Sequence, residues 1–142
     1  MQNKTDENIV QASTKNILMV YPKYSKTFWS FENILDILGK KASFPPLGLL
    51  SISSMLPVSW NKKLIDMNTD PLTDSDIQWA DFVFISAMIV QKESTVKAIE
   101  RVKKLGKTIV AGGPLFTTSW EEVKDVDHLF LGEAEHTIND FI

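Results

Sequence analysis

The sequence predicts an α/β fold with a doubly wound, mainly parallel sheet of five strands. Short apolar runs alternate along the chain with stretches whose apolar residues recur at helical spacing. Several of the apolar runs, such as "NILMVYP" and "DFVFISAM", are continuous rather than alternating, which is typical of strands covered on both faces. Parallel strands need crossover connections, so this alternation favours a parallel sheet with helices on both sides.

Each of the five expected strands ends in polar, Gly or Pro residues. Five strands favour the flavodoxin-like order 2-1-3-4-5, which creates a ligand crevice at the carboxyl ends of the first, third and fourth strands. The residues that follow those strands are therefore the first candidates for a site. The expected strands are Ile17–Tyr21, Lys63–Asp66, Phe82–Ser86, Thr108–Ala111 and Leu129–Leu131.

The connections carry start and stop signals for helices. Pro46 suits a first helical turn and Pro57 ends that helix, whereas Thr73 is a candidate N-cap for a short crossover helix. Gly106 closes the longest pattern, which turns Val96, Ile99, Val102 and Leu105 inward. The expected helices are "FENILDILGK" up to Gly39, Pro46 to Pro57, "TDSDIQWAD", Gln91–Leu105, and a last one that starts within "GEAEHTINDFI".

Composition narrows the class of protein. The chain has 142 residues, 44% of them hydrophobic, which fits one globular domain. The net charge of -3 comes from interspersed acids and bases without a basic stripe, so a nucleic-acid partner is not expected. The chain has no cysteine, hence no disulfide, no thiolate nucleophile and no cysteine-held iron–sulfur cluster of its own.

The two ends of the sequence differ from its middle. The first sixteen residues are polar, so we expect a flexible tail over 1–16 followed by one domain over 17–142. No window approaches the length of a membrane span or a signal peptide, which indicates a cytoplasmic protein. The last helical pattern starts and then stops, so we expect the chain to be a fragment of a longer polypeptide.

Three residues leave the sheet after the third expected strand: Ser86, Ala87 and Met88. A hydroxyl and free backbone N–H groups at the start of the next helix can hydrogen-bond a carbonyl, phosphate or amide of a ligand. The competing interpretation is that Ser86 only caps or turns the chain.

Glycines follow the fourth and fifth expected strands. Glycine permits positive φ and lacks a Cβ atom, so a flat or bulky ligand can lie against the main chain. The competing interpretations are a tight turn without a ligand for the glycines and helix capping for the two acids. The residues concerned are Gly112, Gly113, Pro114, Gly132, Glu133 and Glu135.

Histidine and tryptophan do not add a metal or catalytic site. His128 begins the fifth expected strand, at the edge opposite the crevice, and His136 lies in the first turns of the last helix. No second metal ligand stands at a supporting spacing, so we expect no metal site. Trp60 and Trp79 are interpreted as packing residues.

Taken together, "SAM", "GGP" and "GEAE" after successive strands, with "PPLGLL", "LIDMN" and "ADFVFISAM", resemble the N-terminal cobalamin-binding domain of cobalamin-dependent radical S-adenosylmethionine enzymes. The resemblance covers about residues 17–142. It implies a Rossmann-like fold with a corrin ring over the carboxyl edge and the nucleotide tail of the cofactor in a groove. It also implies that Ser86 bonds the tail, that Met88 packs near it, and that Gly112 and Gly113 line the groove.

The sequence departs from the resemblance after the first strand. The usual Asp-x-His-x-x-Gly motif, whose His coordinates cobalt, is replaced by "YPKYSKTFW", so a His lower ligand in that place is excluded. The spacing between Ser86 and Gly112 is also shorter than usual. The loop instead offers aromatic residues that could cover the lower corrin face or, alternatively, form a small core with Phe44 and Leu47. The residues at this edge are Tyr21, Pro22, Tyr24, Phe28, Trp29 and Phe31.

No catalytic groups are visible, so the resemblance implies a holding domain whose partner is elsewhere. A radical S-adenosylmethionine domain of the same longer chain would carry the 4Fe–4S cluster and S-adenosylmethionine, and methyl transfer would be the reaction. A second interpretation is a degenerate domain that docks a partner without cofactor, marked by a crevice filled by Trp29, Phe28 or Phe44. A flavin or nucleotide binder lacks its phosphate loop here, and a receiver domain lacks its clustered acids.

Overall fold

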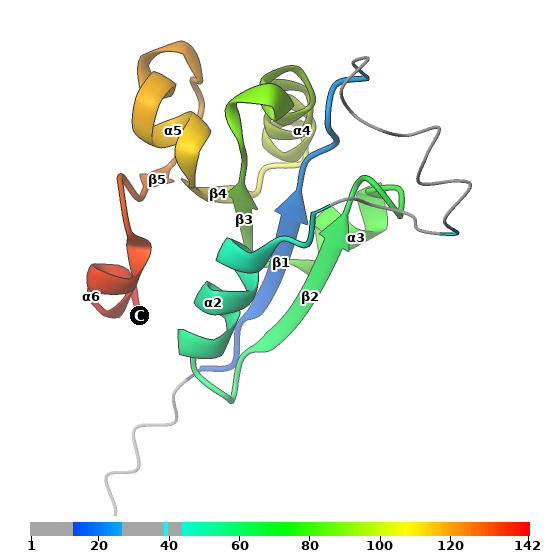
Figure 1. Ribbon diagram of the computed structural model, residues 1–142. Coiled ribbons are helices and arrows are strands. Elements are labelled where there is room, and N and C mark those ends of the chain that lie inside the picture. The colour runs from blue at the N-terminus through cyan, green and yellow to red at the C-terminus, as the bar shows by residue number, and fades with distance from the viewer. Residues whose placement is uncertain (1–12, 27–38, 40–43) are drawn as a thin grey trace, which may run out of the picture.

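A computed structural model of the protein describes residues 13–26, 39 and 44–142. Its five strands form one sheet in the order β2-β1-β3-β4-β5, and every neighbouring pair is parallel. Figure 1 shows this sheet with helices packed on both sides. The predicted fold class and strand order are therefore confirmed. The expected tail over 1–16 falls mostly on residues 1–12, outside the described residues.

The strands lie close to the apolar runs that predicted them, and β5 differs most. It pairs only His128 and Leu129 with Val110 and Ala111, so it ends before the predicted Leu131. A short edge strand leaves few unpaired backbone groups for another chain to pair with. The strands are β1 (Asn16–Tyr21), β2 (Asn61–Asp66), β3 (Phe82–Ser86), β4 (Thr108–Gly112) and β5 (His128–Leu129).

The helices follow the predicted signals, with one addition. The segment after β4, where only a turn was expected, forms α5, and Pro114 takes its first position, where an N–H has no intrahelical partner anyway. The helix expected before Gly39 falls on residues outside the described part. The helices are α2 (Leu47–Met55), α3 (Asp74–Trp79), α4 (Lys92–Lys104), α5 (Pro114–Ser119) and α6 (Ile138–Phe141), with 3₁₀ turns Ile89–Gln91, Trp120–Glu122 and Ala134–His136.

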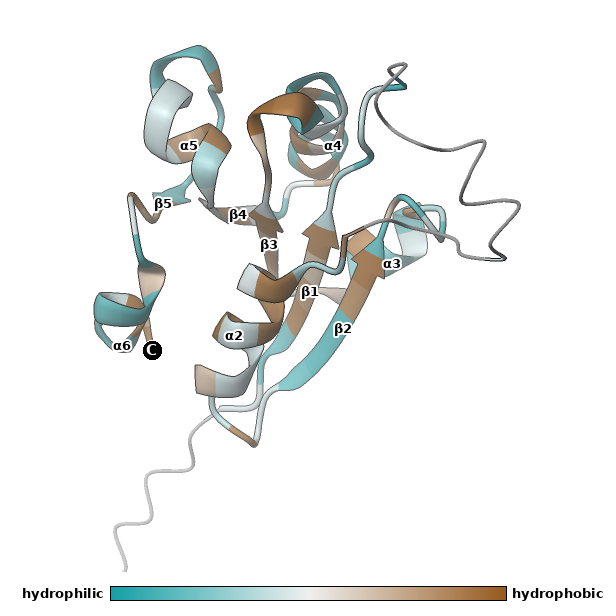
Figure 2. Cartoon of the chain, viewed as in Figure 1, coloured by the Kyte–Doolittle hydropathy of each residue, from teal (hydrophilic) through white to brown (hydrophobic). Residues whose placement is uncertain are grey.

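Two apolar layers cover the two faces of the sheet. Alternate residues of β1 divide between them, because Leu18 and Val20 pack in the cluster of α3, α4 and α5 while Ile17 and Met19 pack in the cluster of α2 and α6. All four side chains are buried. Figure 2 shows β1 and β3 hydrophobic along most of their length. This two-sided burial explains why the central strands read as continuous apolar runs.

The buried stripe of α4 is shifted slightly from the predicted one. Ile99 and Val102 are buried as predicted, but Val96 is only half-buried, and Thr95 and Ala98 are buried in addition. The Thr95 hydroxyl donates to the Gln91 carbonyl at 2.8 Å, so this polar side chain is buried without an unpaired donor.

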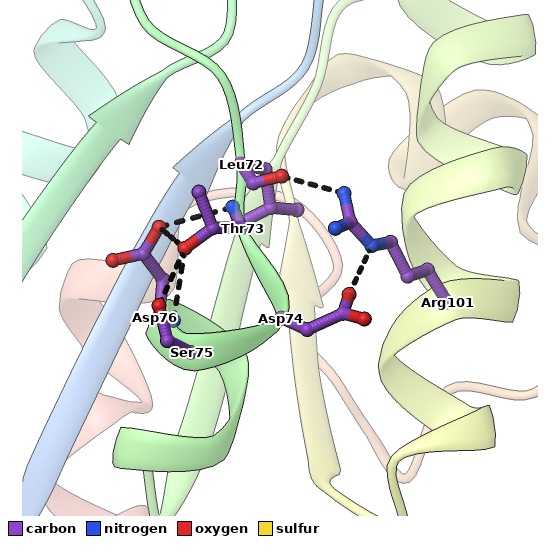
Figure 3. A network of polar contacts seen from close by, with 6 residues as sticks. All are labelled: Leu72, Thr73, Asp74, Ser75, Asp76 and Arg101. Atoms are coloured by element: carbon purple, nitrogen blue, oxygen red, sulfur yellow. Dashed lines mark hydrogen bonds and ion pairs between the residues drawn. The ribbon is translucent and has the colours of Figure 1, made fainter.

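A polar network fixes the start of α3 (Figure 3). The Thr73 hydroxyl accepts a hydrogen bond from the Asp76 N–H at 3.2 Å, and Asp76 Oδ2 accepts one from the Thr73 N–H at 3.0 Å, which forms a capping box. The predicted cap at Thr73 is therefore confirmed. Arg101 of α4 donates to Asp74 Oδ1 at 2.6 Å and to the Leu72 carbonyl at 2.5 Å, which ties the two helices together.

Candidate functional site

A cavity of about 120 Å³ opens at the carboxyl ends of β3 and β4. One wall is α2, and the other is the segment after β5 that leads into the 3₁₀ turn Ala134–His136. Pockets that enclose a whole drug-sized ligand have about 300–1,000 Å³, so only a slim part of a larger ligand can enter this one. Its lining includes Gly48, Ile52, Ser86, Gly112, Gly113, Gly132 and Glu135.

The cavity brings together part of the residue set that the sequence predicted. Ser86, Gly112, Gly113 and Gly132 line it, although they come from the ends of three different strands. These residues meet because the carboxyl ends of parallel strands all lie at the same edge of the sheet. The other six predicted residues lie outside the lining: Tyr21, Pro22, Ala87, Met88, Pro114 and Glu133.

The neighbouring glycines Gly112 and Gly113 differ in how strictly the surrounding chain requires glycine. Gly113 has a φ of +94°, and a Cβ atom there would come within 2.8 Å of Ser86 Oγ and 3.1 Å of the Ala87 carbonyl oxygen. The neighbouring loop of the same chain therefore already demands a glycine at this position. Gly112 does not have positive φ, and its Cβ would lie 3.4 Å from the Phe130 carbonyl oxygen.

Ser86 and the two residues after it behave differently from one another. Ser86 lines the cavity, and its hydroxyl hydrogen-bonds to none of the residues that the structure describes, so it makes no capping bond to them. Two backbone N–H groups here are not free, because Ala87 donates to the Gly112 carbonyl at 3.3 Å and Met88 donates to Gln91 Oε1 at 2.7 Å. For Ala87 and Met88 the expected free N–H is therefore wrong, since the chain itself accepts both hydrogen bonds.

Gln91 is the buried residue that the sequence analysis missed. It is fully buried, and both ends of its side-chain amide are used: Oε1 accepts from Met88 and Nε2 donates to the Pro22 carbonyl at 2.5 Å. Asn68 Nδ2 reaches the same carbonyl at 3.3 Å. Gln91 thus joins the loop after β1 to the loop after β3. The sequence offered one indication of this burial: Gln91 directly follows the apolar residues Met88, Ile89 and Val90 at the start of a predicted helix.

The first residues of the loop after β1 are held by the 3₁₀ turn Ile89–Gln91, by the start of α4 and by Asn68. The Lys23 N–H donates to Ser94 Oγ at 2.9 Å, and the N–H and hydroxyl of Ser25 both donate to the Val90 carbonyl, at 3.4 and 3.0 Å. The Tyr24 N–H donates to Asn68 Oδ1 at 2.9 Å. These bonds replace the backbone partners that a loop otherwise finds in water.

A tyrosine pair lies at the end of β1. The hydroxyls of Tyr21 and Tyr24 are 2.6 Å apart and their rings meet edge to face. Burial raises the pKa of Tyr21, and the hydrogen bond with Tyr24 raises it further, so the Tyr21 hydroxyl stays protonated at neutral pH. A neutral phenol is a hydrogen-bonding group here rather than an anionic ligand.

The structure describes only part of the small aromatic core that was the alternative for this loop. Tyr24 contacts the Phe44 ring, but Phe44 is 64% exposed and Leu47 is 66% exposed. Phe44 also does not line the cavity, so it does not fill the crevice. The other candidate aromatics, Phe28, Trp29 and Phe31, lie outside the described residues.

The remaining candidates are placed as follows. Glu133 stands at the N-cap position before its 3₁₀ turn but makes no capping bond, and its carboxylate lies 3.3 Å from His136 Nε2. Gly132 has the predicted positive φ, at +76°. His128 starts β5 and its ring contacts that of Phe141. Trp60 packs in the α2–α6 cluster as predicted, whereas Trp79 is more than a third exposed and belongs to neither cluster.

Within residues 13–26, 39 and 44–142, no three His, Asp or Glu side chains come together as a group that could hold a metal ion. Among the same residues, no helix has the length and apolar character needed to cross a bilayer.

Comparison with known proteins places these observations in a family. Residues 35–142 match the model of the B12 binding domain family. A protein of Synechocystis sp. described as an uncharacterized methyltransferase is 41% identical over 127 residues, which cover 88% of this chain and 24% of that protein. The hopanoid C-2 methylase of Rhodopseudomonas palustris is 32% identical over 122 residues, 85% of this chain and 23% of the methylase. The chain thus spans about a quarter of the length of these relatives.

Proposed function

The chain belongs to the B12 binding domain family, and on that premise we propose that it binds a cobalamin at the carboxyl edge of its sheet and holds the cofactor for methyl transfer. The observation that carries this proposal is the cavity at the ends of β3 and β4. Glycine backbone and the unpartnered Ser86 hydroxyl line a slot that the described chain leaves open.

The described residues fit the slim part of a corrinoid. The walls of the cavity are mostly apolar, which suits the faces of an aromatic base, and a serine hydroxyl can donate to a ring nitrogen. A whole corrin ring is larger than a cavity of about 120 Å³ admits, so the ring would lie outside it, over the sheet edge. Exposed side chains of Met88, Ile89 and Val90 offer apolar contact there.

We assign roles to the chain's own residues accordingly. Ser86 would bond the nucleotide tail, and Gly112 and Gly113 would line its path. Cobalamin supplies the methyl-carrying chemistry when it is bound, while the protein binds and orients it. Met88 would pack near the tail. The other residues assigned to the cofactor site are Tyr21, Pro22, Ala87, Pro114, Gly132 and Glu133.

The wider protein is also part of the proposal. We propose that residues 17–142 form the cobalamin domain of a longer enzyme, whose radical S-adenosylmethionine domain would hold the 4Fe–4S cluster and S-adenosylmethionine. Two observations support this view: the matched relatives are about four times as long as the aligned region, and their names include methyltransferase and methylase.

The test uses the 142-residue chain and hydroxocobalamin. The two are mixed, free cofactor is removed by gel filtration, and the visible spectrum of the protein fraction is recorded. We expect corrin absorbance to co-elute with the protein, and Ser86→Ala to lower the retained amount several-fold without changing the melting temperature. Ser51→Ala, at an exposed position of α2 away from the cavity, is the matched control.

A second candidate function is docking of a partner domain without cofactor, and the exposed apolar side chains of Phe44, Leu47 and Leu50 favour it. Such residues mark interaction surfaces when they lie together. A colourless protein fraction in the hydroxocobalamin experiment would favour docking over cofactor binding.

A further inference from the structure

Four glycines line the cavity, and two of them have a conformational reason within the described chain. Gly113 and Gly132 have positive φ, at +94° and +76°, so backbone conformation explains them. Gly112 has no positive φ, and a Cβ atom there would make ordinary contacts with the carbonyl oxygen and the Cβ of Phe130, at 3.4 and 3.5 Å. A side chain at Gly112 would therefore pack against Phe130 of the same chain.

Gly48 has neither reason. It is the second residue of α2, with no positive φ, and the one described atom within 4 Å of its missing Cβ is Ser86 Oγ, at an ordinary 3.7 Å. Glycine weakens a helix relative to alanine because it has more backbone freedom to lose. Gly48 therefore makes α2 less stable than alanine would, although an alanine side chain would fit at this position.

The missing side chain of Gly48 opens into the cavity. Gly48 and Ile52 stand four residues apart on α2 and both line the cavity, so this face of the helix is turned toward it. A side chain at position 48 would project toward Ser86 Oγ at the end of β3, a hydroxyl without a partner among the described residues. Any such side chain would narrow the slot between α2 and the end of β3.

We propose that Gly48 determines the ligand specificity of the cavity by setting its width for a flat heteroaromatic base. This inference rests on the proposed cobalamin-binding function. It predicts that position 48 controls whether corrinoids with a nucleotide tail bind, and leaves binding of the corrin ring itself unaffected.

The experiment compares two corrinoids: hydroxocobalamin, and aquacobinamide, which has the corrin ring but no nucleotide tail. Equilibrium dialysis with absorbance detection gives both dissociation constants for the wild type, Gly48→Ala and Gly48→Leu. We expect Gly48→Ala to weaken cobalamin binding about tenfold or more and Gly48→Leu to abolish it, because added atoms overpack the slot. The dissociation constant of aquacobinamide should change less than about twofold between the wild type and either variant.

A melting curve supplies a readout that does not depend on ligand. Without corrinoid, Gly48→Ala should melt at the wild-type temperature or up to about 3 °C above it, because alanine restricts the unfolded chain. The control Ser51→Ala changes an exposed position of the same helix and should alter neither dissociation constant.

The possible results distinguish cobalamin binding by the chain from the role of Gly48 in that binding. A wild type that binds neither corrinoid overturns the proposed function and this inference with it. A wild type that binds cobalamin, with Gly48→Leu binding it equally well, overturns the role of Gly48 alone. A Gly48→Ala chain that melts several degrees lower shows that glycine serves the fold, which also overturns the inference.

Discussion

At the carboxyl edge of the sheet, residues Lys23–Ser25 after β1 hydrogen-bond to other parts of the chain, whereas the cavity at the ends of β3 and β4 is lined by apolar atoms, glycine backbone and the Ser86 hydroxyl, which has no partner among the described residues. We give the name saturated half to Pro22–Ser25 and Gln91, together with the separate start of α3, Thr73–Asp76, whose polar groups are likewise paired within the chain. The second, made of Gly48, Ser86, Gly112, Gly113 and Gly132, is the open half.

The difference indicates what each half does. Paired polar groups favour one position of a loop, and the effect is strongest where they are buried, as at Gln91, because leaving a buried group unpaired is costly. Glycine backbone and a free hydroxyl leave room and a bonding group for something outside the chain. Ligand specificity is therefore expected in the open half, and the position of the loops around it in the saturated half.

The largest effect should come from breaking the saturated half at Gln91. Gln91→Leu leaves the Met88 N–H without its partner and removes one donor from the Pro22 carbonyl, which should lower the free energy of unfolding by about 2–4 kcal/mol. Urea unfolding followed by circular dichroism measures this change. Gln78→Leu, at an exposed position of α3, is the control and should stay within about 0.5 kcal/mol of the wild type.

If Gln91→Leu is as stable as Gln78→Leu, the two loops do not depend on the Gln91 amide. The contrast between the halves would then be one of composition and not of rigidity.

The second effect tests the open half, where only one of two adjacent glycines, Gly113, has a positive φ and a close contact at its missing Cβ. Gly113→Ala forces a Cβ atom into a positive-φ position within 2.8 Å of Ser86 Oγ, and should cost about 1–3 kcal/mol of stability without any ligand. Gly112→Ala meets ordinary contacts and should cost clearly less. The same unfolding measurement compares the two. Equal losses would mean that both glycines serve the fold alike.

Much of the fold could be predicted from the sequence because its signals are local. Continuous apolar runs marked β1 and β3, Thr73 marked the start of α3, and alternation of strands and helices set the parallel order. α5 was missed because Pro114 is compatible with both a turn and a first helical position.

The site was predicted less completely because the roles of its residues depend on contacts between segments that are distant in the sequence. Strand order placed Ser86, Gly112 and Gly132 at one edge, which the sequence could indicate. It could not show that Gly113 packs against Ala87, that Gln91 binds the Pro22 carbonyl, or that Gly48 faces Ser86. Each of these depends on side-chain direction across two elements, which periodicity does not supply.

A third, smaller effect concerns the cap of α3, which belongs to the saturated half. Thr73→Ala removes the oxygen that accepts from the Asp76 N–H, and should cost about 1 kcal/mol of unfolding free energy. Thr73→Ser keeps the hydroxyl and should recover most of the loss. A Thr73→Ser chain as unstable as Thr73→Ala would assign the effect to the methyl group instead of the cap.

The smallest effect is the pH dependence that Asp76 gives to the same cap. Hydrogen bonds from Lys63 and then from Thr73 lower the pKa of Asp76 to about 2, below its value of about 3.9 in an unfolded chain. The stabilisation is therefore complete above about pH 4 and is lost as the pH falls through about 2. Because the Lys63 side chain is half-exposed, we expect under about 1 kcal/mol.

Urea unfolding between pH 6 and pH 2.5 measures this contribution. Asp76→Asn should flatten the fall in unfolding free energy below about pH 4, since its side chain cannot ionise. Glu121→Gln, at an exposed carboxylate without an ion pair among the described residues, is the control and should leave the slope unchanged. If the unfolding free energy falls equally below pH 4 in the wild type, Asp76→Asn and Glu121→Gln, ionised Asp76 does not stabilise the cap. Gln91 would then be the main stabilising residue of the saturated half.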